Sequence, residues 1–179
     1  MKNIIKSIVI GLIIITLIFI FSVLKNKKID VATQVKKIQD IVQVIDSEKN
    51  YQTKTLNNEK YANPLTDGGA QLVGFLKDGK TYKISESLGL SYGVKSFEYY
   101  FSNNQLILVN QKEEYFPYDS NKESLDYSKL EPGFEGYYYF NNEKIIMTQT
   151  RGEKRYQDAI NVEQMFLKTA KENLDLLSK

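Results

Sequence analysis

Apolar and polar residues alternate most clearly between Val94 and Glu114, where the sequence reads VKSFEYYFSNNQLILVNQKEE. Alternation with a period of two is typical of a β-strand with one buried face, and two such runs flank Asn103-Asn104. Asparagine tolerates the left-handed backbone that a tight hairpin turn requires. The segment therefore predicts a β-hairpin at the centre of the fold.

With Asn103-Asn104 as the turn, Phe101 faces Leu106 and Tyr99 faces Leu108, so that one continuous apolar face forms. Phe97 extends this face along the first strand. The other face mixes apolar residues with polar ones: Tyr100, Ile107 and Val109 lie among Ser96, Glu98 and Gln111. A mixed face predicts partial cover by a helix.

Two further hairpins are expected, one on each side of the central hairpin. Residues 72–86 turn at Asp78-Gly79, which predicts that Phe75 pairs with Tyr82 and Val73 with Ile84. Residues 134–150 turn at Asn142-Glu143, which predicts that Phe140 pairs with Ile145 and Tyr138 with Met147. With residues 51–60 as an edge strand, the pattern predicts an antiparallel meander of six to seven strands with loose internal similarity.

Helical periodicity appears before and after the predicted strands. Asp30 is placed to cap a helix that ends near Asp46, and its apolar stripe is Val31, Val35, Ile38, Val42 and Ile45, widened by Ile41 and Val44. A second helix is expected from near Lys154 almost to the C-terminus, with Ala159, Val162, Phe166, Ala170, Leu174 and Leu177 on one face. Two helices packed on an antiparallel meander define an α+β fold.

Residues 7–24 form an uncharged run of 18 residues, flanked by lysines on both sides. As a helix this run extends about 27 Å, close to the hydrocarbon thickness of a bilayer. A cleaved signal peptide is the main alternative, but residues 21–25 offer no small-x-small cleavage site. The sequence predicts a single-pass anchor and basic linker in residues 1–28, and one domain in residues 29–179 outside the cytoplasm.

Composition excludes several classes of chemistry. The chain has 24 basic and 22 acidic residues, and five of the lysines lie in residues 1–29, so the remainder is acidic by three. This balance argues against a nucleic-acid partner. The chain also has no Cys and no His, which removes disulfides, thiolate nucleophiles, most transition-metal sites and the usual nucleophile–base pairs. We expect no cofactor and no catalytic or metal-binding residues.

Residues 89–93, GLSYG, match the G-x-S-x-G pattern of a nucleophile elbow. An elbow requires a base for the serine and a strand-to-helix turn, whereas the residues from Val94 onward are expected to form a strand. We therefore interpret Ser91 as part of a loop between hairpins. An exported hydrolase with a Ser-Lys pair, using Lys83 or Lys95, is the catalytic alternative.

Carboxylates supply two weaker candidates. Asp119, Asn121, Glu123 and Asp126 alternate in a long loop like the start of a calcium loop, but Ser124 and Leu130 replace the Gly and Glu that an EF-hand requires. We interpret this segment as a solvated acidic loop, with weak binding of a divalent ion as the alternative. Glu113-Glu114 is a candidate for acid–base work on sugars if a further carboxylate lies nearby.

The chain contains 13 Tyr residues, many of them in the predicted strands. Tyrosine combines a large apolar ring with a polar tip, so these residues either half-cover the sheet as core or bind a protein or glycan partner. Core packing is the favoured interpretation.

Two resemblances bear on function. The Tyr-Tyr-Phe hairpins of residues 50–150 resemble those of uncharacterised bacterial exported and membrane-anchored small α+β domains, which implies no particular activity. The order of apolar helix, amphipathic helix and sheet is similar in layout to type IV pilins, but Met1–Ile10 contains no acidic residue and lacks the pilin leader pattern. The sequence favours a non-catalytic, membrane-anchored binding or structural domain, with the hydrolase and a pilin-like assembly subunit as alternatives.

Overall fold

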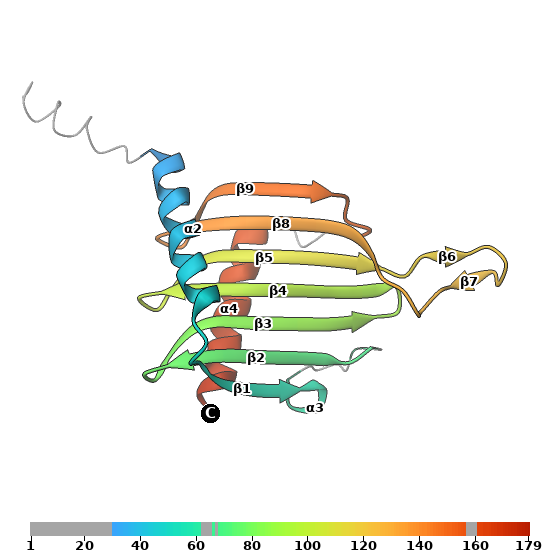
Figure 1. The fold of residues 1–179 in the computed structure, drawn as a ribbon, viewed down its shortest axis with the longest axis horizontal. Coiled ribbons are helices and arrows are strands. Elements are labelled where there is room, and N and C mark those ends of the chain that lie inside the picture. Colours follow the sequence, from blue (N-terminus) through green and yellow to red (C-terminus); the bar gives the residue numbers. More distant parts are fainter. Residues whose placement is uncertain (1–29, 62–65, 67, 157–160) are drawn as a thin grey trace, which may run out of the picture. The chain divides into compact units, whose positions relative to one another are not determined.

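A computed structural model describes residues 30–61, 66, 68–156 and 161–179. Residues 35–179 form one compact unit in which an antiparallel sheet lies between two helices (Figure 1). The helices are α2 (Val31–Ser47), the short α3 (Asn58–Tyr61) and α4 (Val162–Ser178). The strands are β1 (Gln52–Asn57), β2 (Ala70–Lys77), β3 (Lys80–Leu90), β4 (Gly93–Ser102), β5 (Gln105–Tyr115), β6 (Tyr118–Asp119), β7 (Ser124–Leu125), β8 (Glu131–Asn141) and β9 (Lys144–Gly152).

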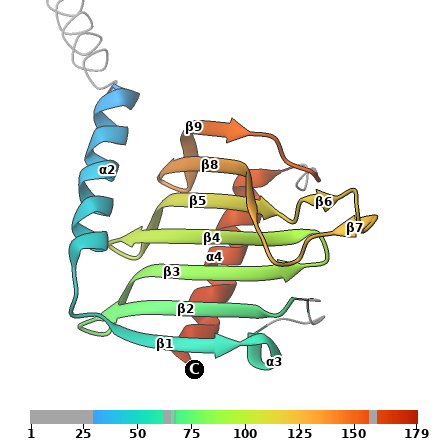
Figure 2. The ribbon, with the colours of Figure 1, turned by 45° about the vertical axis from the view of Figure 1, so that its right-hand side comes forward.

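The α+β meander predicted from the sequence is confirmed. The described strands form a seven-stranded sheet in the order β1-β2-β3-β4-β5-β8-β9, and each neighbouring pair is antiparallel. The predicted edge strand is β1. The predicted long loop between β5 and β8 contains a small two-stranded hairpin of its own, β6-β7, which extends beyond the end of the sheet (Figure 2).

All three predicted turns are present, and both residues of each turn have positive φ. Their φ values are 51° and 71° at Asp78-Gly79, 50° and 62° at Asn103-Asn104, and 49° and 60° at Asn142-Glu143. Positive φ at both central residues defines the type I′ turn, whose twist matches that of the flanking strands. Asn, Asp and Gly, which tolerate this conformation, occupy five of the six positions, and Glu143 occupies the sixth.

Each of these hairpins has one extra residue at the third position after its turn. In the central hairpin Phe101 pairs with Leu106 as predicted, but Tyr100 pairs with Leu108, so Ile107 has no partner across the strand. The equivalent extra residues are Tyr82 in β3 and Ile146 in β9. The repeated β-bulge is a structural similarity that the sequence showed only loosely.

Beyond the bulges the pairing register differs from the predicted one, because one extra residue reverses which face the following side chains occupy. The predicted pair Tyr99–Leu108 is wrong, and Tyr99 instead pairs with Val109. The same shift replaces three other predicted pairs: Phe75–Tyr82 becomes Phe75–Lys83, Val73–Ile84 becomes Val73–Ser85, and Tyr138–Met147 becomes Tyr138–Thr148. The pair next to the third turn, Phe140–Ile145, is as predicted.

The bulges also create the surface on which α2 packs. Ile107 and Leu108 both join the apolar cluster beneath α2, as do Ile146 and Met147. From α2, Val35, Ile38 and Ile45 are buried in this cluster, which confirms the centre of the predicted stripe. Val31 and Val44 were expected in the stripe, but they are 42% and 68% exposed. The apolar face of α2 is therefore narrower than its sequence indicated.

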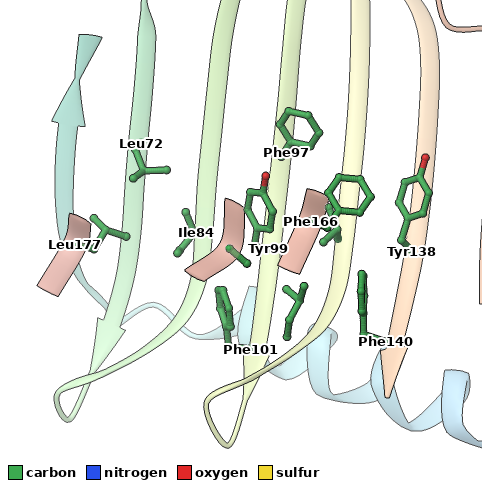
Figure 3. Packing of buried hydrophobic residues seen from close by; sticks show 12 residues of the cluster. Leu72, Ile84, Phe97, Tyr99, Phe101, Tyr138, Phe140, Phe166 and Leu177 are labelled. Atoms are coloured by element: carbon green, nitrogen blue, oxygen red, sulfur yellow. The ribbon is translucent and has the colours of Figure 1, made fainter. Parts of the chain in front are cut away.

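The other face of the sheet packs on α4 and holds the larger core, part of which Figure 3 shows. Phe166 of α4 is 1% exposed and lies between Phe97 and Tyr138, with ring centroids 6.1 and 4.7 Å away. Val109 moves to this core because of the bulge at Ile107 and is fully buried. Each such fully buried apolar side chain contributes about 1.5–3 kcal/mol to folding.

The C-terminal helix begins later than the sequence predicted. It starts at Val162 rather than near Lys154, and the Asn161 side chain caps it by accepting a hydrogen bond from the Gln164 amide at 3.0 Å. Glu153 to Tyr156 lie outside any helix, and predicted Ala159 lies outside the described residues. The main-chain amide of Arg155 donates to the Tyr115 hydroxyl at 2.7 Å, so tertiary contacts hold this segment on the sheet.

The predicted membrane segment, residues 7–24, lies outside the described residues. Among the helices that the structure describes, none combines the length and the apolar character needed to cross a bilayer.

Candidate ligand-binding face

Ser91, the centre of the G-x-S-x-G match, is exposed in the two-residue turn between β3 and β4. A strand follows this turn, as expected, and not the helix of a nucleophile elbow. Lys83 lies near the opposite end of β3, where its ammonium contacts Glu98 at 2.7 Å and Asp46 at 3.0 Å. The Lys95 ammonium contacts the Glu113 carboxylate at 3.1 Å.

Glu113 and Glu114 occupy opposite faces of β5, because successive residues of a strand alternate. The Glu113 carboxylate is 3% exposed and accepts hydrogen bonds from Gln111 at 2.8 Å and Tyr115 at 2.7 Å, in addition to its ion pair with Lys95. Burial, followed by the hydrogen bond to Glu113, raises the pKa of Tyr115. The two glutamates therefore do not form a pair of facing carboxylates.

The acidic loop folds around local partners. Asp119 pairs with Lys122 at 3.3 Å, and Asp126 pairs with Lys129 at 3.3 Å. Hydrogen bonds from Ser128 are the largest influence on Asp126 and lower its pKa to about 2. In the part of the chain that the structure describes, no three acidic side chains come close enough together to hold a metal ion.

The buried tyrosines confirm the prediction that tyrosine serves as core. Four of them are at most 6% exposed, and their hydroxyls reach polar groups on neighbouring strands or on α2: Tyr99, Tyr100, Tyr138 and Tyr139. Tyr99, for example, donates to the buried carboxylate of Glu86 at 2.9 Å. Burial and the nearby Glu86 charge raise the pKa of Tyr99 well above its ordinary value.

The α2 side of the sheet is covered over only part of its width. From Val35 onward α2 crosses the strands near the hairpin turns, and no other described helix crosses the remaining half of this face (Figures 1 and 2). Two rows of residues run across all seven strands on this open half. The row nearer α2 is Thr55, Val73, Ser85, Glu98, Asn110, Tyr137 and Gln149; the row beyond it is Asn57, Gln71, Ser87, Ser96, Lys112, Glu135 and Arg151.

We call these two rows the polar band. Only Val73 among its members has a purely hydrocarbon side chain. The charges of the band balance, since Glu98 and Glu135 are matched by Lys112 and Arg151. The band is therefore a hydroxyl- and amide-rich surface without net charge.

A groove of about 690 Å³ opens where the band meets α2. Its walls come from Gln39, Val42, Gln43, Asp46 and Ser47 of α2 and from Leu108, Tyr137, Tyr139 and Gln149 of the sheet. This volume is within the range of small-molecule sites, about 300–1,000 Å³. A second hollow of about 640 Å³ includes Lys112, Glu135 and Arg151, so the surface is hollowed at both sides of the band.

Asn110 is the residue of the band whose chemistry is incomplete. It is 7% exposed and pairs across the strands with Glu98 and Tyr137. Its Oδ1 atom is buried and has no hydrogen-bond partner among the described residues. An unpaired buried acceptor costs about 1–3 kcal/mol, so such a group requires an explanation. Its cross-strand neighbour Tyr137 and Leu108 of its own strand line the groove, whereas Asn110 itself does not.

The charged residues of the band have partners. Glu135 accepts from Tyr137 at 3.0 Å and from Arg151 at 3.0 Å, and burial together with that hydrogen bond raises the pKa of Tyr137. Glu98 accepts from Lys83. Burial disfavours the Lys83 charge, but the hydrogen bonds to Glu98 and Asp46 outweigh it and raise the pKa of Lys83.

A scan against protein-family models, a search of curated proteins and a search of solved structures gave no match to this chain. The candidate site therefore depends on the geometry of this chain alone. Sequence reasoning missed Asn110, Gln149, and Gln39 and Gln43 of α2. The one signal that points to Asn110 is an amide that directly follows the apolar run Leu106–Val109 of a strand.

Proposed function

We propose that residues 30–179 form a non-catalytic ligand-binding domain, and that residues 7–24 hold it at the cell membrane on the outer side. The groove between α2 and the polar band is its binding site. The observation that carries this proposal is the groove itself, which α2 and the sheet line together with amide, carboxyl and phenol side chains.

The groove supplies polar contacts from both walls. Gln39 donates to Tyr139 at 3.2 Å, and Tyr139 donates to Gln149 at 3.3 Å, so the amide and phenol groups are already oriented. Preorientation of this kind lowers the entropic cost of binding.

The membrane part of the proposal is supported by the uncharged run of residues 7–24 with its lysine flanks. Since the chain has no Cys, a single Cys placed at exposed Ser120 gives an unambiguous label. Ser120→Cys in intact cells should react with a membrane-impermeant maleimide, and the intact mass of membrane-extracted protein should include residues 1–29. Labelling only after lysis, or a mature N-terminus beyond Leu24, contradicts this part.

Binding is tested with residues 30–179 and isolated bacterial cell envelopes in a sedimentation assay. The wild-type fragment should sediment with the envelopes, and a fragment with Tyr137→Ala and Gln149→Ala should stay in solution. Thr150→Ala is the matched control, since Thr150 is equally an exposed β9 residue but points to the α4 side. Failure of the wild-type fragment to sediment refutes the proposed function.

A further inference from the structure

We infer that the ligand of this groove is an envelope component with an organic ammonium group, which binds to the Asp46 carboxylate at the end of α2. This ligand chemistry rests on the proposed function, because it specifies what the same groove binds. The charge of the groove, its aromatic lining and the end of α2 support it.

The charge of the groove favours a cationic ligand. Among the described residues that line it, Asp46 alone carries a charge, and the others are apolar or bear an amide or a hydroxyl. A bound cation is attracted by this carboxylate, whereas an anion is repelled. An uncharged ligand that covers the carboxylate removes its water without an equivalent interaction in return.

The Asp46 carboxylate keeps acceptor sites for a ligand. Its side chain is 45% exposed, whereas the Lys83 side chain that pairs with it is 16% exposed and does not line the groove. Lys83 contacts Oδ1 of Asp46 at 3.0 Å, and the Tyr100 hydroxyl lies 3.2 and 3.1 Å from Oδ1 and Oδ2. Tyr100 has one hydrogen to donate and also lies 2.9 Å from Glu98. A carboxylate accepts about four hydrogen bonds, so these two donors do not saturate Asp46.

The surroundings of Asp46 carry more negative than positive charge. Asp46 and Glu98 share one cation, Lys83, which contacts them at 3.0 and 2.7 Å. Glu48, just beyond α2, is already paired with Lys77. Asp46 also lies in the last turn of α2, where the free carbonyl groups favour a cation, and this turn holds no basic residue. An ammonium group here offsets the excess charge and complements the helix end.

The sheet wall and α2 give the groove a lining for the body that carries the ammonium group. Tyr137 is half-buried on the sheet wall, and its hydroxyl donates to Glu135 at 3.0 Å, which holds the ring in place. Val42 of α2 and Leu108 of β5 add apolar surface. An organic ammonium compound suits this lining, because an aromatic ring attracts both cations and hydrocarbon groups. The volume of about 690 Å³ accommodates such a group.

The first test is a calorimetric titration of the full chain, in an uncharged detergent, with phenethylamine, 2-phenylethanol and phenylacetate. These probes share a phenyl body and differ in charge at neutral pH. Phenethylamine should bind saturably, with Kd at or below about 1 mM, and about tenfold more tightly than either other probe. Asp46→Asn keeps an acceptor oxygen but removes the charge, so it should weaken that binding about tenfold. Asp40→Asn is the matched control, since Asp40 is an exposed acid of α2 that does not line the groove, and binding should be unchanged.

The second test uses the envelope sedimentation assay with envelopes treated with acetic anhydride, which converts their amines into uncharged amides. The wild-type fragment should sediment with untreated envelopes and stay in solution with acetylated ones. Asp46→Asn should stay in solution with both, and Asp40→Asn should behave like the wild type. Extraction of the envelopes with chloroform and methanol then locates the amine: binding that is lost assigns it to a lipid headgroup, and binding that persists assigns it to a wall polymer.

Three results overturn the inference: phenethylamine that binds no more tightly than 2-phenylethanol, binding that Asp46→Asn leaves intact, or acetylated envelopes that still bind the wild-type fragment. The envelope assay separates this failure from failure of the proposed function. If acetylated envelopes bind the wild-type fragment but not the fragment with Tyr137→Ala and Gln149→Ala, the groove is a binding site and its ligand is not an amine. If the wild-type fragment does not bind untreated envelopes at all, the proposed function itself is wrong.

Discussion

Replacement of Asn110 by valine should make the protein more stable, because it removes a buried acceptor that has no hydrogen-bond partner among the described residues. Asn110 is 7% exposed, and its Oδ1 has no partner among the described residues. Leaving a buried acceptor unpaired costs about 1–3 kcal/mol. Valine removes that cost and has a higher strand propensity than asparagine. Its larger volume strains the packing and lowers part of the stabilisation. We expect a net stabilisation of about 1–2 kcal/mol.

Asn173 provides a matched control of opposite sign. It is 2% exposed on α4, and its Nδ2 donates to the buried carboxylate of Glu86 at 3.3 Å. Asn173→Leu improves helix propensity but deprives a buried carboxylate of a donor, and a hydrogen bond to a charged group contributes about 1.5–3 kcal/mol. This variant should lose about 1–2 kcal/mol.

Urea unfolding of residues 30–179, followed by circular dichroism, measures the change in the free energy of unfolding of each variant. The change is obtained from the shift of the unfolding midpoint, provided that the dependence of the free energy on urea concentration is the same as in the wild type. In thermal melts, about 1–2 kcal/mol corresponds to a shift of about 2–8 °C for a domain of this size. If Asn110→Val is no more stable than the wild type, Oδ1 is satisfied in the free protein and the reasoning is refuted. Equal effects of the two variants in the same direction would also refute the reasoning.

Three further outcomes are expected. Tyr99→Phe should destabilise the fragment by about 1.5–3 kcal/mol in urea unfolding, because Glu86 loses a buried donor at 2.9 Å; an effect below about 0.5 kcal/mol would contradict this. Ser91→Ala should change stability by no more than about 0.5 kcal/mol, and a serine-reactive fluorophosphonate should not label the wild-type protein; stoichiometric labelling at Ser91 would restore the hydrolase alternative. The Asp126 carboxyl should titrate near pH 2 by NMR. The hydrogen bonds that Asp126 accepts should therefore keep its loop ordered above that pH, and this order should be lost as the pH falls through it. Ser128→Ala should move the titration midpoint upward toward the usual value, and an unchanged midpoint would contradict the assignment of Ser128 as the main partner of Asp126.

Local chemistry explains the parts of the fold that the sequence predicts correctly. The three type I′ turns have positive φ at six positions, and Asp78, Gly79, Asn103, Asn104 and Asn142 supply residues that accept it at five of them. Turns of this kind fix which strands pair, so the meander follows from them. The 3.6-residue period of α2 likewise predicts its bounds to within a residue.

The β-bulges were beyond sequence reasoning because they leave no local mark in the pattern. Leu106 to Val109 are four consecutive apolar residues, so either parity of the strand buries two of them and the sequence cannot choose between the two. The choice is made by α2 and α4, which pack on opposite faces and take Leu108 and Val109 respectively. The start of α4 was misjudged for a similar reason, since residues near Lys154 are held on the sheet through Tyr115 and not by their own helical propensity.

The sequence by itself determined the strand order, the turn chemistry and the absence of Cys and His chemistry, because each follows from residue type or from contacts between near neighbours. Only the tertiary structure decided which face of the sheet is left open. α2 lies over the ends of the strands nearest the hairpin turns and leaves the opposite ends uncovered. The uncovered face brings Asn110, Tyr137 and Gln149 from three strands into one row. Long-range packing sets such an arrangement, and no window of the sequence contains it.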